Sequence, residues 1–318
     1  MKKLIKFKEY CETKGLSYTL RFIFHKIKTG TGKVQGYNDL LYFLFHHNLS
    51  AGYKDDLSGW HVYIKLKKEF EKYMYSLPEY KVSDKKVKII WWCWLQGEEN
   101  APVLCKKCLN SIRKHFPDYE VKVVTNDNML DYIHLPQYIL DKFNKGYFSR
   151  THFSDILRTL LLVEHGGIWI DSTVYCTGRN DSLLSLPLFV YQDWKFNRKQ
   201  AFICSSWFIS AWKGDPILST TRDLIFEYWK KHDFLDNYFL FHLFFHLATE
   251  RYKKEWDKVP LFSNLPPHYL QFELFDNYSS DRYDQIMAAA DFHKLTYKDQ
   301  RMATGQRGSF YNHLILGE

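Results

Sequence analysis

The run KVKIIWWCWLQG (86–97) constrains the fold more than any other part of this chain. It is rich in Ile, Val and Trp and ends in a glycine, which is typical of a buried parallel strand and the loop after it. Such a strand needs helices on both faces of its sheet, because neither face can be left to water. The run therefore predicts an α/β domain that begins at residue 86.

The residues after 97 continue the alternation of helix and strand. Helical spacing covers 101–116, a second strand is predicted at 119–125, and a helix over 147–167 leads into a third strand at 168–171. Elements of these lengths imply a mostly parallel sheet with right-handed crossovers. In the last third we expect long helices at 216–232 and 238–256 and a loop leading into a strand at 264–274.

The first 85 residues show helical spacing and predict a helical N-terminal extension to a domain over 86–318. Residues 1–33 hold nine Lys and Arg against two Glu, which is +7 of the chain's net charge of +8. Apolar residues lie among these bases, a mixture that suits an interfacial helix on anionic lipid or a helix packed on the domain by one face. Nucleic acid is not an expected partner, because no base-reading module follows.

The chain has no apolar run of about 18 residues, so no membrane-spanning helix is expected. Its charged start also lacks the apolar core and cleavage site of a signal peptide. The six cysteines are compatible with reduced thiols. We expect a cytoplasmic protein, with peripheral attachment to the inner face of the membrane as one form of it.

Asp171 follows the third strand in GGIWIDSTVY (166–175). A carboxylate after a buried run is costly unless its charge is used, and ligands of open parallel sheets bind outside the carboxyl ends of the strands. Asp155 and Arg158 lie three residues apart on the preceding helix, on one face of it. They form either an intrahelical salt bridge or part of a site with Asp171.

The block SDILRTLLLVEHGGIWIDSTV (154–174) resembles the sugar-nucleotide-binding core of retaining glycosyltransferases that share a DXD motif, similar to glycosyltransferase family 32. That group includes bacterial capsular polysaccharide synthesis proteins and, more distantly, the clostridial glucosylating toxins. Residues 88–121 resemble the opening strand, loop and helix of the capsular group. The resemblance covers 86–175 well and implies a GT-A fold, a Rossmann-like sheet flanked by helices.

The resemblance assigns roles to several residues. Asp155 and Arg158 match the SDxxR motif, in which the acid bonds donor-sugar hydroxyls and the arginine reaches sugar or phosphate. Trp91 and Trp92, at the end of the first strand, either stack on the nucleotide base or pack in the core.

The DXD motif itself is incomplete, since the chain has Asp171, Ser172 and Thr173. All three are candidates for contact with the ribose or diphosphate. A hydroxyl is a poorer ligand than a carboxylate for a hard cation, so we expect a weakly held Mn²⁺ or Mg²⁺ at Asp171. His293 is a second candidate ligand.

Two further residues are candidates for catalysis. By the resemblance, Lys294 follows His293 in a segment that approaches the leaving diphosphate; the alternative is a surface turn. Asp236 begins a predicted helix and either caps it or faces the acceptor. Arg158, Lys294 and a cation at Asp171 would then stabilise the charge that develops on the diphosphate.

The resemblance implies a bacterial transferase that moves a hexose from a nucleotide diphosphate sugar, such as UDP-galactose or UDP-glucose, to a hydroxyl of a lipid-linked glycan. The resemblance implies a role in capsular or surface polysaccharide synthesis and retention of the α-anomer. The missing second carboxylate leaves one alternative, a non-catalytic protein with a degenerate transferase fold that binds sugars or a membrane surface.

Overall fold

A computed structural model describes residues 11–12, 14–29, 51–84, 86–192, 200–299 and 307–317. Its centre is a five-stranded sheet with the order β2 (Glu120–Val124), β1 (Ile89–Cys93), β3 (Gly167–Ile170), β6 (Cys204–Ala211) and β5 (Leu188–Gln192). Strand β1 pairs in parallel with β2 and β3, whereas β6 is antiparallel to both β3 and β5. The predicted α/β fold with a mostly parallel sheet is confirmed, and the three predicted strands are β1, β2 and β3.

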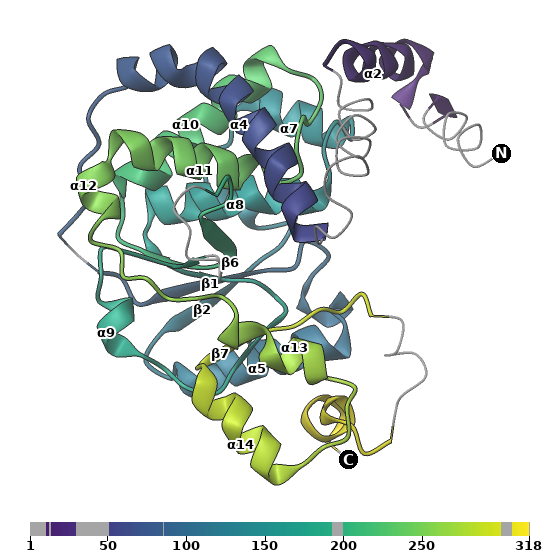
Figure 1. Ribbon diagram of the computed structural model, residues 1–318, viewed down its shortest axis with the longest axis vertical. Helices are drawn as coiled ribbons and strands as arrows, with labels where there is room; N and C mark the ends of the chain where they lie inside the picture. Colours follow the sequence, from purple (N-terminus) through teal and green to yellow (C-terminus); the bar gives the residue numbers. More distant parts are fainter. Residues whose placement is uncertain are drawn as a thin grey trace.

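Helices cover both faces of this sheet (Figure 1). One face carries α4 (Ala51–Ser76), α8 (Arg150–Glu164), α10 (Pro216–Lys231) and α11 (Leu240–Arg251). The other carries α5 (Val103–His115), α13 (Tyr269–Glu273) and α14 (Ser280–Ala289). Shorter helices and turns join them: α6 (Met129–Tyr132), α7 (Gln137–Asn144), α9 (Asp181–Leu184), α12 (Lys253–Trp256), Glu98–Asn100, Pro266–His268 and Asn312–Leu316.

Alternate strand residues enter two separate cores. In β1, Trp91 packs with the helices of the α8 side, while Ile90 and Trp92 pack with those of the α5 side. Strand β3 divides its side chains in the same way, with Trp169 on the α8 side. Both faces of the central strands are therefore dry, as the apolar run 86–97 indicated.

Two glycines connect α8 to β3. Gly166 and Gly167 have φ of 76° and 102°, a region that other residues rarely adopt. A Cβ on Gly167 would lie 2.6 Å from the carbonyl oxygen of Ile89 in the neighbouring strand. Glycine thus permits both the sharp turn and the close approach of β3 to β1, which delivers Asp171 directly beyond the strand end.

The last third differs from expectation in two places. The strand predicted within 264–274 is wrong, because these residues form the Pro266–His268 turn and α13. Leu270 and Leu274 lie four residues apart and are both buried, which is the spacing of a helical face. The helix predicted at 238–256 is divided into α11 and α12, with Tyr252 at the division.

The N-terminal segment contributes to the same core as the sheet. Helix α4 buries Leu66, Phe70 and Met74 against α10 and α11, in the core that also covers one face of the sheet. Helix α2 (Leu16–Thr29) lies at the edge of the molecule (Figure 1). Residues 1–10, 13 and 30–33 of the basic segment lie outside the described residues, so membrane-surface binding stays a prediction.

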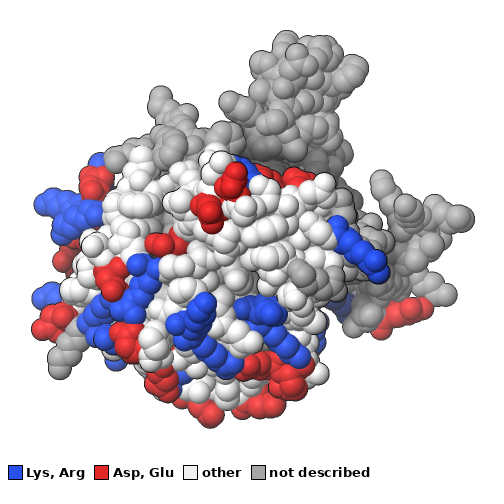
Figure 2. All heavy atoms as spheres, turned by 90° about the horizontal axis from the view of Figure 1, so that it is seen from below, with Lys and Arg blue, Asp and Glu red and all other residues white. Residues whose placement is uncertain are grey.

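Charges on one face of the molecule are mixed. On the face seen in Figure 2, Lys and Arg side chains lie among Asp and Glu side chains. None of the helices in the described part of the chain is both long and apolar enough to cross a bilayer.

A second, two-stranded antiparallel sheet joins β4 (Val174–Cys176) to β7 (Phe292–Lys294). Its register places Val174 opposite Lys294 and Tyr175 opposite His293. Strand β4 begins three residues after Asp171, so this pairing brings the C-terminal third of the chain to the end of β3.

Candidate functional site

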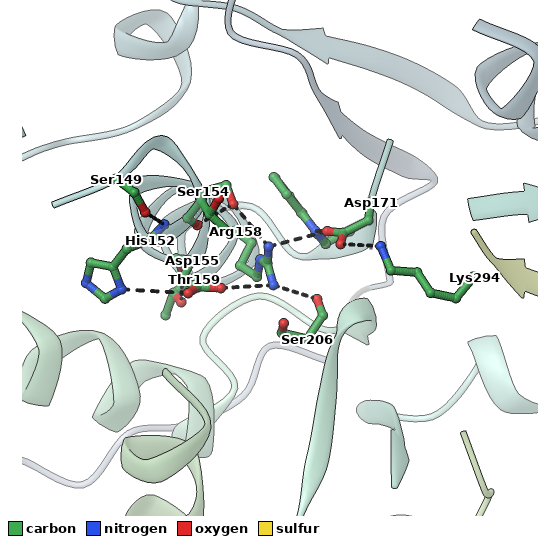
Figure 3. A network of polar contacts seen from close by, with 11 residues as sticks. Ser149, His152, Ser154, Asp155, Arg158, Thr159, Asp171, Ser206 and Lys294 are labelled. Atoms are coloured by element: carbon green, nitrogen blue, oxygen red, sulfur yellow. Dashed lines mark hydrogen bonds and ion pairs between the residues drawn. The ribbon is translucent and has the colours of Figure 1, made fainter. Parts of the chain in front are cut away.

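Asp171 lies immediately beyond β3, and its backbone N–H donates to the carbonyl of Trp207 at 2.9 Å. Its side chain is 23% exposed. Oδ1 accepts hydrogen bonds from the Trp169 indole at 2.8 Å and from Arg158 Nη2 at 3.3 Å. Oδ2 accepts from Lys294 Nζ at 3.0 Å, so both oxygens of the carboxylate have donors (Figure 3).

Arg158 lies on α8 and joins the two acids of the site. Its Nη1 is 3.1 Å from Asp155 Oδ1 and donates to the carbonyl of Ser206 at 2.9 Å. Its Nη2 donates to Asp171 and to Ser154 Oγ. Only 4% of the side chain is exposed. The intrahelical salt bridge is therefore present, and the same guanidinium also holds Asp171 in place.

Lys294 reaches the site from β7. Its Nζ donates to Thr173 Oγ1 at 2.6 Å as well as to Asp171, and its side chain is 20% exposed. The N–H of Leu295 donates to the carbonyl of Thr173 at 2.8 Å, which fixes the two backbones side by side. The alternative that Lys294 lies in a surface turn is thus wrong, since it is in a strand and points at Asp171.

The two bases set the protonation of Asp171. Burial alone would raise its pKa, but the charges of Lys294 and Arg158 outweigh burial and lower the pKa to about 2. Asp171 is consequently a carboxylate at any pH at which the protein works. Asp155 and Asp171 are matched by Arg158 and Lys294, so the cluster has no net charge.

One histidine behind this cluster, His152, was missed by sequence reasoning. His152 is buried, and its Nε2 accepts from the Trp229 indole at 3.0 Å. The proton of the ring is therefore on Nδ1, which faces Asp155 Oδ2 at 3.7 Å (Figure 3). Its spacing of three residues from Asp155 on a helix was the available signal. His242 on α11 is near the same charges, and burial lowers its pKa to about 4.

Trp91 and Trp92 do not face the site. Trp91 is buried on the α8 side of the sheet and donates to the carbonyl of Gly166 at 2.9 Å, and Trp92 is buried on the α5 side. The prediction that they stack on a nucleotide base is therefore wrong, because both rings are enclosed by helices and neighbouring strands. Trp94, just past β1, is half-buried and meets the ring of Tyr297 edge-on.

Asp236 belongs to a different part of the molecule. Its side chain is 2% exposed and pairs with His25 Nε2 of α2 at 2.8 Å and Lys65 Nζ of α4 at 2.7 Å. It neither caps α11, which begins at Leu240 after Phe239, nor lies open to an acceptor. It joins the N-terminal helices to the loop before α11, and the prediction of a catalytic role is wrong.

The described side chains do not fit a divalent cation at Asp171. Both of its oxygens accept from protein donors, and Thr173 Oγ1 accepts from Lys294. His293 is fully buried with its Nε2 2.9 Å from Thr177 Oγ1, so it is not a ligand partner for Asp171. Ser172 lies near the thiol of Cys105 and opposes the rise that burial causes in the pKa of that thiol. In the described ranges, no group of three or more His, Cys, Asp or Glu side chains is arranged to hold a metal.

The fold and the site define an α/β protein with a compensated acid–base cluster at the carboxyl end of a central parallel strand, where such sheets bind ligands. The model of the capsular polysaccharide synthesis protein family matches residues 46–314, so the chain belongs to that family. None of the curated proteins matches the chain. A solved structure titled "PaToxG Glycosyltransferase" is 17% identical over 64% of this chain and 84% of that chain, with a TM-score of 0.33.

Proposed function

We propose that the protein is a glycosyltransferase that moves a hexose from a nucleotide diphosphate sugar, UDP-linked, to a hydroxyl of a lipid-linked glycan, with retention of the α-anomer. The observation that supports this most is the meeting of Asp171, Asp155 and Lys294 at the end of β3 in a member of the capsular polysaccharide synthesis protein family. Carboxylates can accept from sugar hydroxyls, and an ammonium can pair with a diphosphate.

The proposed reaction requires stabilisation of the leaving diphosphate and fixed positions for the two carboxylates. Negative charge builds on the leaving diphosphate as the sugar–phosphate bond breaks, and Lys294, which is part-exposed, is placed to stabilise it. Arg158 is almost fully buried, so it acts by holding Asp155 and Asp171 at fixed positions rather than by reaching substrate. Neither carboxylate is assigned as a nucleophile, and we propose a front-side displacement.

The partners follow from the same proposal. The donor binds at the end of β3, and the acceptor hydroxyl approaches from the exposed side of Asp171. A lipid-linked acceptor places the enzyme at the cytoplasmic face of the membrane, where the basic residues of 1–33 would contact anionic lipid.

The test is turnover of UDP-, GDP- and dTDP-hexoses, measured as release of the nucleoside diphosphate with and without lipid-linked acceptor. Asp171→Asn should remove nearly all release of the diphosphate, whereas Asp131→Asn, at an exposed position on α6, should leave it unchanged. Binding of a nucleotide sugar without turnover of any donor would favour the non-catalytic alternative.

A further inference from the structure

The position between Asp171 and Thr173 is filled by a protein side chain. Lys294 Nζ lies 3.0 Å from Asp171 Oδ2 and 2.6 Å from Thr173 Oγ1, the two oxygens that the first and third residues of the motif present. A lysine ammonium has three N–H donors, and these contacts use two of them. The side chain is 20% exposed, and the third N–H is the donor that we assign to a ligand.

The charges explain why this lysine accompanies the incomplete motif. Two carboxylates and a divalent cation sum to zero, and so do one carboxylate and one ammonium. Compared with two carboxylates and a dication, Thr173 in place of the second carboxylate lowers the negative charge by one. Lys294 in place of the dication lowers the positive charge by one, so the sum stays zero. A hydroxyl is a weak ligand for a hard cation, but it is a good acceptor for an ammonium.

Backbone pairing between β4 and β7 fixes the main chain of Lys294 beside the motif. Lys294 stands opposite Val174 in the β4–β7 register, and the bond from Leu295 N–H to the Thr173 carbonyl continues that pairing. Lys294 is thus carried to the motif by main-chain hydrogen bonds. A cation entering between Asp171 and Thr173 would have to displace it.

We propose that the Lys294 ammonium is the cation of this site and that a nucleoside diphosphate binds there without a divalent metal. This inference rests on the proposed function for the identity of the ligand. The cationic contact to the diphosphate then comes from β7, and its strength does not depend on the concentration of free metal.

The first experiment measures binding of UDP, GDP and dTDP to the full-length protein by calorimetry, in EDTA and in MnCl₂. The affinity should agree in the two conditions within about three-fold. Lys294→Met should weaken it at least about ten-fold, because a charge-assisted hydrogen bond is lost. Lys254→Met, at an exposed position on α12, is the matched control and should have no effect. Affinity that falls ten-fold or more in EDTA would overturn the inference.

The second experiment does not need a nucleotide to bind. Free Mn²⁺ is followed by electron paramagnetic resonance while MnCl₂ is titrated into the protein. Wild type should bind no Mn²⁺ at this site, whereas the double variant Thr173→Asp/Lys294→Met, which supplies two carboxylates and removes the ammonium, should bind it. If the wild-type protein binds Mn²⁺ and the Asp171→Asn variant does not, the inference is contradicted. This outcome can be read even if the double variant fails to fold. Failure of all three nucleotides to bind counts against the proposed donor, while this titration still decides the role of Lys294.

Discussion

Replacing Arg158 with methionine should destabilise the protein strongly. The guanidinium is 4% exposed and pairs with Asp155 at 3.1 Å and Asp171 at 3.3 Å. Methionine fills much of the same volume but leaves both carboxylates without this partner. Removing one member of a buried ion pair typically costs about 3–5 kcal/mol, because the remaining charge is left desolvated. The cost should fall at the upper end here, since the carbonyl of Ser206 also loses its donor.

A loss of about 4 kcal/mol corresponds to a fall in melting temperature on the order of 10 °C for a domain of this size. Equilibrium unfolding in urea, monitored by tryptophan fluorescence, gives the free energy directly. The matched control is Arg113→Met, whose pair with Glu98 is exposed and should contribute at most about 1 kcal/mol. Adding Asp155→Asn to Arg158→Met should recover part of the loss, because one of the two unpaired carboxylates is removed. A variant within 1 kcal/mol of wild type would show that Arg158 does not hold the acids together.

Three further predictions concern other parts of the molecule. Burial lowers the pKa of His293 from its ordinary value to about 4, so the folded protein favours the neutral ring. This preference contributes up to about 3 kcal/mol to the free energy of unfolding. The contribution is present above pH 6.5 and is lost as the pH falls toward 4. His293→Gln should reduce the change in the free energy of urea unfolding between pH 7 and pH 4.5. An unchanged dependence of that free energy on pH would contradict this. Gly167→Ala should lower that free energy by more than about 1 kcal/mol, whereas Gly308→Ala, also at positive φ but with open space, isolates the backbone part of the cost. Deletion of residues 1–33 should abolish sedimentation with anionic vesicles, and salt-insensitive binding by the intact protein would refute an electrostatic contact.

The part of the site that lies close together in sequence could be predicted from the sequence. Asp155 and Arg158 share a helical face, and two glycines and a short apolar run fix Asp171 at the next strand end. Local periodicity and turn chemistry are sufficient for these three, because fewer than twenty residues separate them. Lys294 is 123 positions from Asp171. Only the family resemblance predicted Lys294 as a site residue, because no local sequence pattern indicates which distant strand pairs with β4.

The predictions that failed did so for a common physical reason. Trp91 and Trp92 stand in a strand whose two faces are both covered, so alternation moved one ring to each core and neither to the site. Asp236 pairs with His25 and Lys65, which come from helices more than 170 residues earlier. In each case a distant element supplies the environment, and residue type alone does not distinguish a buried partner from an open ligand site.

Thr173 shows how such a distant element changes the meaning of a motif. Taken alone, a threonine in place of the second carboxylate weakens a metal site, and a protein with a degenerate function becomes a reasonable alternative. Lys294 supplies a positive charge at 2.6 Å from that hydroxyl, so the substitution removes the ligand that a dication needs and keeps an acceptor that an ammonium can use. A second carboxylate at 173 would give the cluster a net charge of −1, which would oppose the binding of a diphosphate that we propose. The proposed role of Lys294 therefore predicts that Thr173 and Lys294 vary together among related sequences.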